Sequence, residues 1–507
     1  MIISEMQRKL ATWATTDPSF RVDRLLRLIT HPDWLAEAAR LTLCTKGAHT
    51  PGVDGVDRLK LQTRLTEELN ILRGELLSGS YRPLPARRVY IPKANGKQRP
   101  LGIPTLRDRI VQRAMLMAME PIWECDFHSL SYGFRPERSV HHAIRTVKLQ
   151  LTDCGQARGR WVIEGDLSSY FDTVHHSLLM KAIRRRIRDA RFMILLWRMI
   201  KAGHVDAGLF RAASEGVPQG GVISPLLSNI MLNEFDKYLH KHYLSTESRK
   251  EREKWNRSVR NGQAVAILEH RQLRPAVSYC RYADDFVIIV KGTKTDALTI
   301  REECRYVLED SLKLRLNMEK TKVTHVNDGF VFLGHRIIRK CSRYGKMRVV
   351  TTIPKERARN FAASLTALLS GNYSESKVSM VELINRKLKG WSAFYQFVDF
   401  KARIFSYIDR VVFWKLAYWL AHKYRKSIKQ LMRMWCKTPK PGMNRTWILF
   451  GKANNGSLCG EILYRMVGQG KKSFRWRNPE GNPYLRTESR NTWTSRYAEV
   501  AMALNSI

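Results

Sequence analysis

Two apolar runs meet at a pair of carboxylates in Val277-Ser278-Tyr279-Cys280-Arg281-Tyr282-Ala283-Asp284-Asp285-Phe286-Val287-Ile288-Ile289-Val290. Neighbouring side chains on a strand point to opposite faces, so consecutive Asp residues can converge on one site only if the backbone turns between them. The pattern predicts a hairpin with its carboxylates at the tip. It indicates a metal site for phosphate chemistry, because Mg²⁺ is usually held through one or two carboxylates and substrate phosphates. For this motif taken alone, a solvated Asp-Asp turn is the alternative.

The net charge favours a protein that binds nucleic acid, and the distribution of apolar residues argues against a membrane protein. The 507 residues include 88 Lys and Arg against 46 Asp and Glu, a formal charge of +42. Such an excess repels itself in a compact fold unless a polyanion neutralises it, and nucleic acid is the commonest polyanion. No apolar run approaches the roughly 18 residues that span a bilayer, and no secretory leader opens the chain. We expect no membrane contact and a location in the bacterial cytoplasm or at the nucleoid. The oligomeric state is left open.

Two further segments extend the predicted site. Residues 161–166 read as a short apolar strand that ends in Asp166. Chemistry with two metals needs carboxylates from separate elements, and Asp166 with Asp284 and Asp285 meets that need. Residues 89–103 read as a hairpin around Asn95-Gly96, with basic side chains at its tip that can reach a phosphate. Alternating helices and strands up to this region indicate an α+β core.

Seven motifs in order carry a resemblance to a known family. They are Ile91-Pro92-Lys93-Ala94-Asn95-Gly96-Lys97-Gln98-Arg99-Pro100-Leu101-Gly102-Ile103-Pro104; Tyr132-Gly133-Phe134-Arg135-Pro136; Asp166-Leu167-Ser168-Ser169-Tyr170-Phe171-Asp172; Gly216-Val217-Pro218-Gln219-Gly220-Gly221-Val222-Ile223-Ser224-Pro225-Leu226-Leu227-Ser228-Asn229; Tyr282-Ala283-Asp284-Asp285; Leu316-Asn317-Met318-Glu319-Lys320-Thr321-Lys322; and Phe332-Leu333-Gly334. Over roughly residues 45–395, the chain resembles group II intron-encoded reverse transcriptase/maturase proteins.

The resemblance implies roles for named residues. Asp166, Asp284 and Asp285 would bind two Mg²⁺ ions, with Mn²⁺ as a possible substitute and Asp285 as the less direct ligand. Lys320 would donate a proton to the leaving pyrophosphate, with Lys322 as the alternative.

Other residues would contact the incoming deoxynucleotide. Lys93 and Arg99 would clamp its triphosphate. Phe171 would exclude a ribose 2′-hydroxyl, and Gln219 and Gly220 would lie against the template and the nascent base pair.

Further residues are expected to contact nucleic acid. Arg135 would line the template path or hold its own loop. A basic insertion at residues 237–274 would contact intron RNA, with a solvated charged helix as the alternative. In the last third of the chain, the candidates for phosphate contact are Lys387, Lys389, Lys423, Arg425 and Lys426.

The implied fold is α+β and follows the right-hand polymerase plan. Fingers and palm would occupy residues 1–345, an α-helical thumb or maturase domain residues 346–424, and a small basic domain that resembles DNA-binding modules residues 425–507. Helical spacing of apolar residues beyond Tyr344 supports the thumb. Because Cys436 and Cys459 are far apart, we expect no endonuclease domain of the paired-cysteine kind, and priming from an existing 3′ end.

The implied function is an RNA-directed DNA polymerase that binds group II intron RNA, assists its splicing and copies it into target DNA from dNTPs. One alternative is a maturase that acts only in splicing. Another is a free-standing reverse transcriptase with a host role in DNA repair or defence. The free-standing enzyme would share every motif named above. A maturase that acts only in splicing has no need to retain the full set of Asp166, Asp284, Asp285, Lys93 and Arg99.

Overall fold

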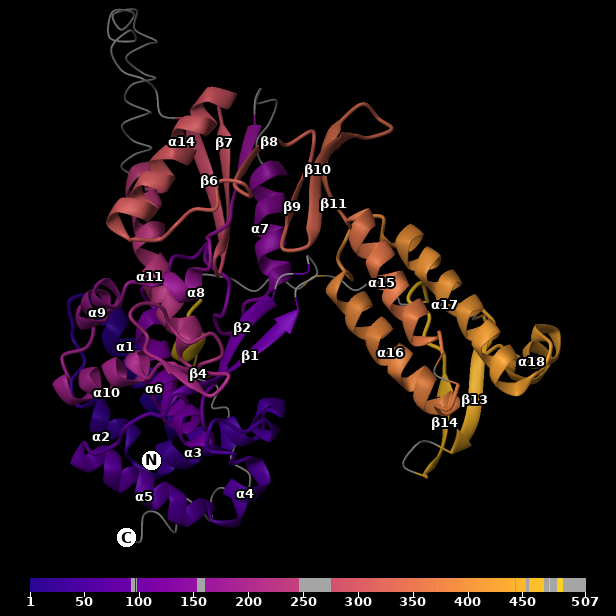
Figure 1. Cartoon of the computed structure of the whole chain (residues 1–507). Helices are drawn as coiled ribbons and strands as arrows, with labels where there is room; N and C mark the ends of the chain where they lie inside the picture. Colours follow the sequence, from indigo (N-terminus) through magenta and orange to yellow (C-terminus); the bar gives the residue numbers. More distant parts are fainter. Residues whose placement is uncertain are drawn as a thin grey trace, which may run out of the picture. The chain divides into compact units, whose positions relative to one another are not determined.

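The computed structural model describes residues 1–92, 96, 98–152, 160–245, 275–371, 373–442, 444–452, 456–468, 474 and 481–486 (Figure 1). Its contacts divide the chain into two compact units. Unit 1 comprises Met1–Val147, Gln156–Val323 and Asn478–Ile507, and unit 2 comprises Lys148–Gly155 and Thr324–Arg477. The contacts therefore divide the chain differently from the predicted fingers and palm, thumb and C-terminal domain, whose boundaries at residues 345 and 424 remain a prediction.

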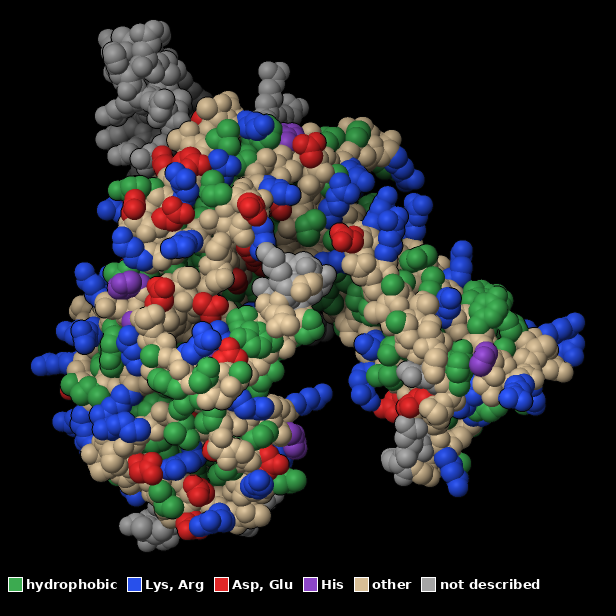
Figure 2. Space-filling model, in the orientation of Figure 1, with side chains coloured by type: hydrophobic (Ala, Val, Ile, Leu, Met, Phe, Trp, Pro, Cys, Tyr) green, Lys and Arg blue, Asp and Glu red, His purple; other side chains and the backbone are tan. Residues whose placement is uncertain are grey.

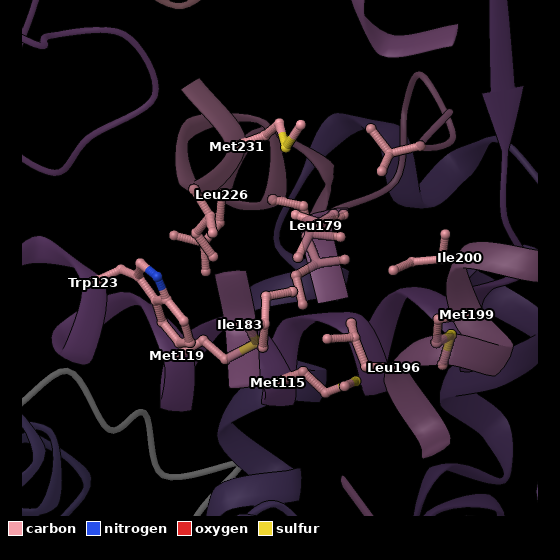
Figure 3. Packing of buried hydrophobic residues seen from close by; sticks show 14 of the residues in the cluster. Met115, Met119, Trp123, Leu179, Ile183, Leu196, Met199, Ile200, Leu226 and Met231 are labelled. Atoms are coloured by element: carbon pink, nitrogen blue, oxygen red, sulfur yellow. The ribbon is translucent and has the colours of Figure 1, made fainter. Parts of the chain in front are cut away.

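A helical layer of unit 1 forms the larger apolar core. Met119 and Trp123 on one helix lie with Ile183 and Leu226 from two others, all nearly inaccessible to solvent (Figure 3). Burying such a side chain contributes about 1.5–3 kcal/mol each. The helices before residue 324 are α1 (Ile3–Thr16), α2 (Leu25–Ile29), α3 (Pro32–Leu43), η1 (Lys46–His49), α4 (Arg58–Thr63), α5 (Leu65–Ser78), α6 (Leu106–Glu124), α7 (Val140–Thr152), α8 (Tyr170–Thr173), α9 (His176–Arg184), α10 (Ala190–Lys201), α11 (Ser224–Leu239), η2 (His240–Leu244), α14 (Lys294–Tyr306) and η3 (Val307–Ser311).

The hairpin predicted at residues 89–103 is present in a small four-stranded sheet. Strands β1 (Ala86–Pro92) and β2 (Gln98–Ile103) pair antiparallel, with Pro92 opposite Gln98. The sheet order is β2-β1-β4-β5, where β4 (His204–Asp206) runs parallel to β1 and β5 (Leu209–Arg211) forms the edge. Lys93, at the predicted tip, lies outside the described residues.

The second sheet of unit 1 contains the carboxylate hairpin. Its order is β6-β7-β3-β8, formed by β6 (Ala276–Tyr282), β7 (Asp285–Lys291), β3 (Arg160–Gly165) and β8 (Lys322–His325), of which Lys322 and Val323 belong to unit 1. Helices cover both faces: the Tyr279 hydroxyl donates to Asp236 of α11, whereas the neighbouring Cys280 thiol contacts the Ala143 carbonyl of α7. Successive side chains of β6 thus meet different helices, as the pleat requires.

Unit 2 combines a three-stranded sheet, a bundle of helices and a second small sheet. A single apolar core extends from Ile353 through Leu388 and Trp419 to Met466. Leu431, Trp447 and Met466, from the described residues after 424, therefore lie in the same core as the helices of the predicted thumb. The elements are β9 (Phe330–Phe332), β10 (His335–Cys341), β11 (Met347–Thr352), α15 (Lys355–Leu368), α16 (Lys377–Phe394), α17 (Lys401–Tyr424), α18 (Ile428–Trp435), β12 (Cys436–Lys437), β13 (Thr446–Lys452) and β14 (Leu458–Ile462).

Two regions of the sequence prediction are only partly visible. Of the basic insertion at residues 237–274, the end of α11 and the π-helix η2 are described, and residues 246–274 lie outside the described part. In the basic tail, the 3-10 turn η4 (Pro483–Leu485) belongs to unit 1. Among the helices that are described, none has the length and apolar character needed to cross a membrane.

Candidate active site

The strand register brings the three predicted carboxylates to one edge of the sheet. Tyr282 pairs with Asp285 across the β6–β7 turn, so Ala283 and Asp284 form its tip. Gly165, the last residue of β3, pairs with Phe286 of β7. Asp166 is the next residue after Gly165, and it therefore lies beside Asp285 at the same end of the sheet. The convergence expected from sequence is present in the fold.

Burial and mutual repulsion disfavour ionisation of the paired carboxyls. Burial raises the pKa of Asp284, and the negative charge of Asp166 raises it further. For Asp285, burial and then the charges of Asp284 and Asp166 raise the pKa to about 7. Carboxylates that raise one another's pKa are poised to gain from a cation placed between them.

The carboxylate oxygens of Asp166, Asp284 and Asp285 suit a divalent cation, although they are not arranged as a coordination shell. Across the described ranges, no three His, Cys, Asp or Glu side chains are arranged as a metal site. Carboxylate oxygens are nevertheless the ligands that Mg²⁺ and Mn²⁺ prefer, and a cation would relieve the repulsion among these three groups. Asp166, Asp284 and Asp285 therefore fit such an ion in chemistry and charge.

Lys320 contacts the cluster directly. Its Nζ donates a hydrogen bond to Asp166 Oδ2 at 2.8 Å. This hydrogen bond, more than any other cause, raises the pKa of Lys320, and Asp166 and Asp285 add to the effect through their charge. Lys322, the alternative proton donor, is an exposed residue of β8. Of the two lysines, Lys320 is the one the structure brings to the carboxylates.

A chain of hydrogen bonds through Gln219 links the β1–β2 hairpin to Asp172, which follows Asp166 in the same motif. Arg99 Nε lies 3.5 Å from Gln219 Oε1, and Gln219 Nε2 donates to Asp172 Oδ2 at 3.2 Å. The Gln219 carbonyl accepts from the Gly102 backbone N–H at 2.6 Å. Gly220 has a φ of +113°, and a Cβ there would lie 2.3 Å from the Gly102 carbonyl oxygen, so a side chain cannot be accommodated. The loop at Gln219 and Gly220 is thus fixed against β2.

Phe171 lies beside this chain as a largely buried ring. It contacts Tyr170 and Phe134 edge-on, with ring centroids 5.6 and 6.4 Å away. Phe134 itself is half exposed and has a left-handed φ of +57°. Packing of this kind keeps the Phe171 ring in one orientation, and a rigid ring is what steric exclusion of a hydroxyl would need.

Comparison with known proteins identifies the family. Residues 91–337 match the family described as reverse transcriptase (RNA-dependent DNA polymerase), and residues 358–435 match the group II intron maturase-specific domain. The Escherichia coli K12 protein YkfC is 79% identical over 369 residues, which cover 73% of this chain and 97% of YkfC. The chain belongs to the group II intron-encoded reverse transcriptase/maturase family.

The chain is also similar to more distant proteins. The group II intron-encoded protein LtrA of Lactococcus lactis is 34% identical over 347 residues, 62% of this chain and 56% of LtrA. The chain thus spans nearly all of YkfC and about half of LtrA. A solved structure of Candida albicans telomerase with a telomeric RNA fragment covers 70% of this chain and 62% of that chain at 12% identity. The TM-score of that comparison is 0.35.

In this reverse transcriptase, Arg135 holds its own loop, and its assignment to the template path is corrected. The guanidinium is buried and pairs with the buried carboxylate of Glu124, with Nη2 2.7 Å from Oε1. Its Nη1 donates to the carbonyls of His128 and Ser131. A group so buried and so fully paired cannot reach a phosphate without losing these bonds.

Three buried polar residues at the site were missed by the sequence reasoning. Arg281, Asp236 and Asn229 form a network directly behind the carboxylate turn. A charged residue inside the apolar run of β6 was the available signal, but its partners on α11 are far away in sequence. Only the fold shows what Arg281 contacts.

The predicted RNA contacts of unit 2 divide into two kinds. Four of them are exposed, as contact with a phosphate would require: Lys387, Lys389, Arg425 and Lys426. Lys423 instead donates to the Tyr373 carbonyl and lies over the Trp419 ring, so its ammonium already has partners. Figure 2 shows Lys and Arg side chains over the visible surface of this unit, with few Asp or Glu among them.

Proposed function

We propose that this chain is an RNA-directed DNA polymerase that binds group II intron RNA, assists its splicing and copies it into DNA at a target site. The observation that carries the proposal is the convergence of Asp166, Asp284 and Asp285 at one end of the β6-β7-β3 sheet, where burial raises the pKa of Asp284 and of Asp285. Similarity to group II intron-encoded proteins along most of the chain supports the choice of RNA.

The proposed chemistry assigns the three carboxylates to two Mg²⁺ ions. When bound, such ions would activate a primer 3′-hydroxyl and offset charge on the triphosphate. Asp166, Asp284 and Asp285 would hold them, with Mn²⁺ as a substitute. Because Lys320 pairs with Asp166 in the structure described here, its ammonium is near enough to the site to serve as a general acid toward pyrophosphate.

Substrate selection would rest on the fingers and the loop behind them. Arg99, together with Lys93, would bind the triphosphate of a dNTP, which suits a planar fork and a point charge. Gln219 would remain hydrogen-bonded to Asp172 and support the nascent base pair. The Phe171 ring would exclude a ribose 2′-hydroxyl and so favour deoxynucleotides. Lys387 and Lys389 would bind RNA phosphates, and target DNA would be met by basic residues of the C-terminal part.

Primer extension on an RNA template with Mg²⁺ tests the proposal. The wild-type chain is expected to extend the primer, and Asp284→Ala to lower extension by about 1,000-fold or more, since a metal-binding carboxylate is worth several kcal/mol in the transition state. RNA binding should be nearly unchanged. Asp310→Ala, which removes an exposed carboxylate on η3, is the matched control and should extend normally.

Other outcomes would redirect the proposal. No extension by a folded wild-type chain that still binds intron RNA would reject the polymerase and favour a maturase that acts only in splicing. Loss of both extension and RNA binding in Asp284→Ala would mean that the carboxylate is structural. Extension with no intron around the coding frame would favour the free-standing reverse transcriptase.

A further inference from the structure

Arg281 is the largest charged group buried behind the carboxylate turn. Its side chain is completely inaccessible to solvent. The guanidinium Nε and Nη2 donate to the two oxygens of Asp236 at 2.9 and 2.5 Å. The remaining Nη1 donates to Asn229 Oδ1 and to the Ala283 carbonyl, both at 3.0 Å. One side chain therefore joins helix α11 to the tip of the β6–β7 hairpin.

The residue that Arg281 holds has an unusual backbone. Ala283 is a non-glycine residue with φ of +57°, a conformation that costs roughly 1–2 kcal/mol for an L-residue. It persists only where surrounding contacts over-determine it. Asp284 and Asp285 follow Ala283 directly, so the direction of both carboxylates depends on this turn.

A second set of contacts also packs on the turn. At Gly133, a Cβ would lie 2.3 Å from the Ala283 nitrogen, so the glycine backbone is packed directly against the turn. Asn229 Nδ2 donates to the Gly133 carbonyl at 2.8 Å. Asn229 thus bridges Arg281 and the Gly133 loop, and the turn is enclosed between them.

The ion pair suits positioning better than it suits stability. A buried pair of charges loses so much hydration that apolar residues of equal volume are often as stabilising or more so. A planar fork, however, can bind both oxygens of Asp236 and still direct a hydrogen bond to a fixed carbonyl. An ammonium at the same place has neither the span nor the planarity for all these partners.

We propose that Arg281 is a positioning residue that fixes the Ala283 carbonyl and thereby sets how tightly Asp284 and Asp285 bind a divalent cation. Asp236 anchors the guanidinium, and Asn229 couples it to the Gly133 loop. The inference rests on the proposed function only in treating these carboxylates as metal ligands. Partners behind a ligand commonly change metal affinity by about 10–100-fold when they are replaced.

The test compares Arg281→Lys with a matched substitution at another buried pair. Arg186→Lys is the control, because Arg186 also binds both oxygens of one carboxylate, Asp126, but otherwise contacts backbone carbonyls of Ala14, Asp17 and Phe20. Mn²⁺ binding to the full chain is titrated by electron paramagnetic resonance. Primer extension is measured in parallel against Mg²⁺ concentration, and unfolding is followed with urea.

Arg281→Lys is expected to weaken Mn²⁺ binding and to raise the half-saturating Mg²⁺ concentration by about 10-fold or more. The maximal rate should fall while KM for the template-primer stays unchanged. Arg186→Lys should lose stability to a similar degree and keep the wild-type metal response. Equal metal responses in the two variants, or an unchanged response in Arg281→Lys, would overturn the proposal.

Asn229→Ala keeps the test decisive if Arg281→Lys does not fold. It leaves the Arg281–Asp236 pair intact and removes two hydrogen bonds, one from Arg281 Nη1 and one to the Gly133 carbonyl. Because only part of this loss reaches the carboxylates, a smaller rise of about threefold is expected. No rise would count against the network. If the wild-type chain binds Mn²⁺ and extends no primer, the proposed function fails, whereas the Mn²⁺ titrations still decide the role of Arg281.

Discussion

Asp236 is a fully buried carboxylate and Asp285 a half-buried one, both in unit 1, and their surroundings differ. Asp236 is fully enclosed and has both oxygens bound by the Arg281 guanidinium. In the described part of the chain, no cation forms an ion pair with Asp284 or Asp285, and burial raises the pKa of both. The fold thus neutralises one buried carboxylate internally and leaves a neighbouring pair to be neutralised from outside. Such a contrast separates a supporting group from a binding group.

The largest difference is expected when the charge of the paired carboxylate, Asp236, or of an unpaired one, Asp284, is removed. Asp236→Asn leaves the Arg281 charge buried and without its counter-ion, which is expected to cost about 3–5 kcal/mol of unfolding free energy. Asp284→Asn should leave stability at neutral pH unchanged or slightly raised, because a poorly solvated charge disappears. Urea unfolding of the full chain measures both. Similar losses in the two variants would remove the distinction between paired and unpaired carboxylates.

Lys320 is the intermediate case, since it contacts Asp166 from an exposed position. If its ammonium serves as the general acid, Lys320→Met should lower the maximal extension rate by about 100-fold. Lys322→Met is the matched control and should change the rate less than about twofold under the same assignment. A reversed pattern would transfer the role to Lys322.

The unpaired carboxyls also predict a pH dependence of stability without metal. Burial and the neighbouring carboxylates raise the pKa of Asp285 in the folded chain to about 7, above the 3.8 of an ordinary Asp side chain. Between these values the folded state keeps a proton that the unfolded state has released, so stability should fall as pH rises from about 4 to 7 and then level off. The slope is on the order of 1 kcal/mol per pH unit. Asp285→Asn should flatten it when unfolding is measured in EDTA.

The smallest effect is expected on RNA binding, from substitution of exposed lysines that have no buried partner. Lys387 and Lys389 are exposed on α16, and the double substitution to Ala should weaken RNA binding slightly and reduce the salt slope by roughly 0.7–0.9 per lysine. Lys423→Ala should leave the slope nearly unchanged, because that ammonium is bound to the Tyr373 carbonyl. Filter binding at several salt concentrations distinguishes the two lysine classes.

Sequence reasoning succeeded where a pattern is local. The hairpin at residues 89–103, the strand before Asp166 and the turn at Asp284 all occur in the fold, because strand alternation and turn residues are properties of short segments. It left open whether Arg135 lines the template path or holds its own loop, and it did not show that the Lys423 ammonium is bound to the Tyr373 carbonyl. Whether a cation is exposed depends on which distant carboxylates and carbonyls fold around it.

The predicted domain boundaries show the same limit, because a local pattern does not show which distant segments pack together. Helices were expected beyond Tyr344 from apolar spacing, whereas the structure first forms strand β11 (Met347–Thr352) and begins helix α15 at Lys355. Nothing in that spacing indicates that β13 and α18 share the core of these helices. Apolar patterns show that a face is buried, and they do not show which other face covers it.

The order and chemistry of the motifs were sufficient to identify a reverse transcriptase and to name its three carboxylates, because those properties are written in residue types and spacing. The support behind the carboxylates came from tertiary contacts alone. Arg281, Asn229 and Gly133 come from three separate segments and meet at Ala283 only after the sheet has packed on α11. Burial and orientation are properties of that packing, and spacing along the chain does not contain them.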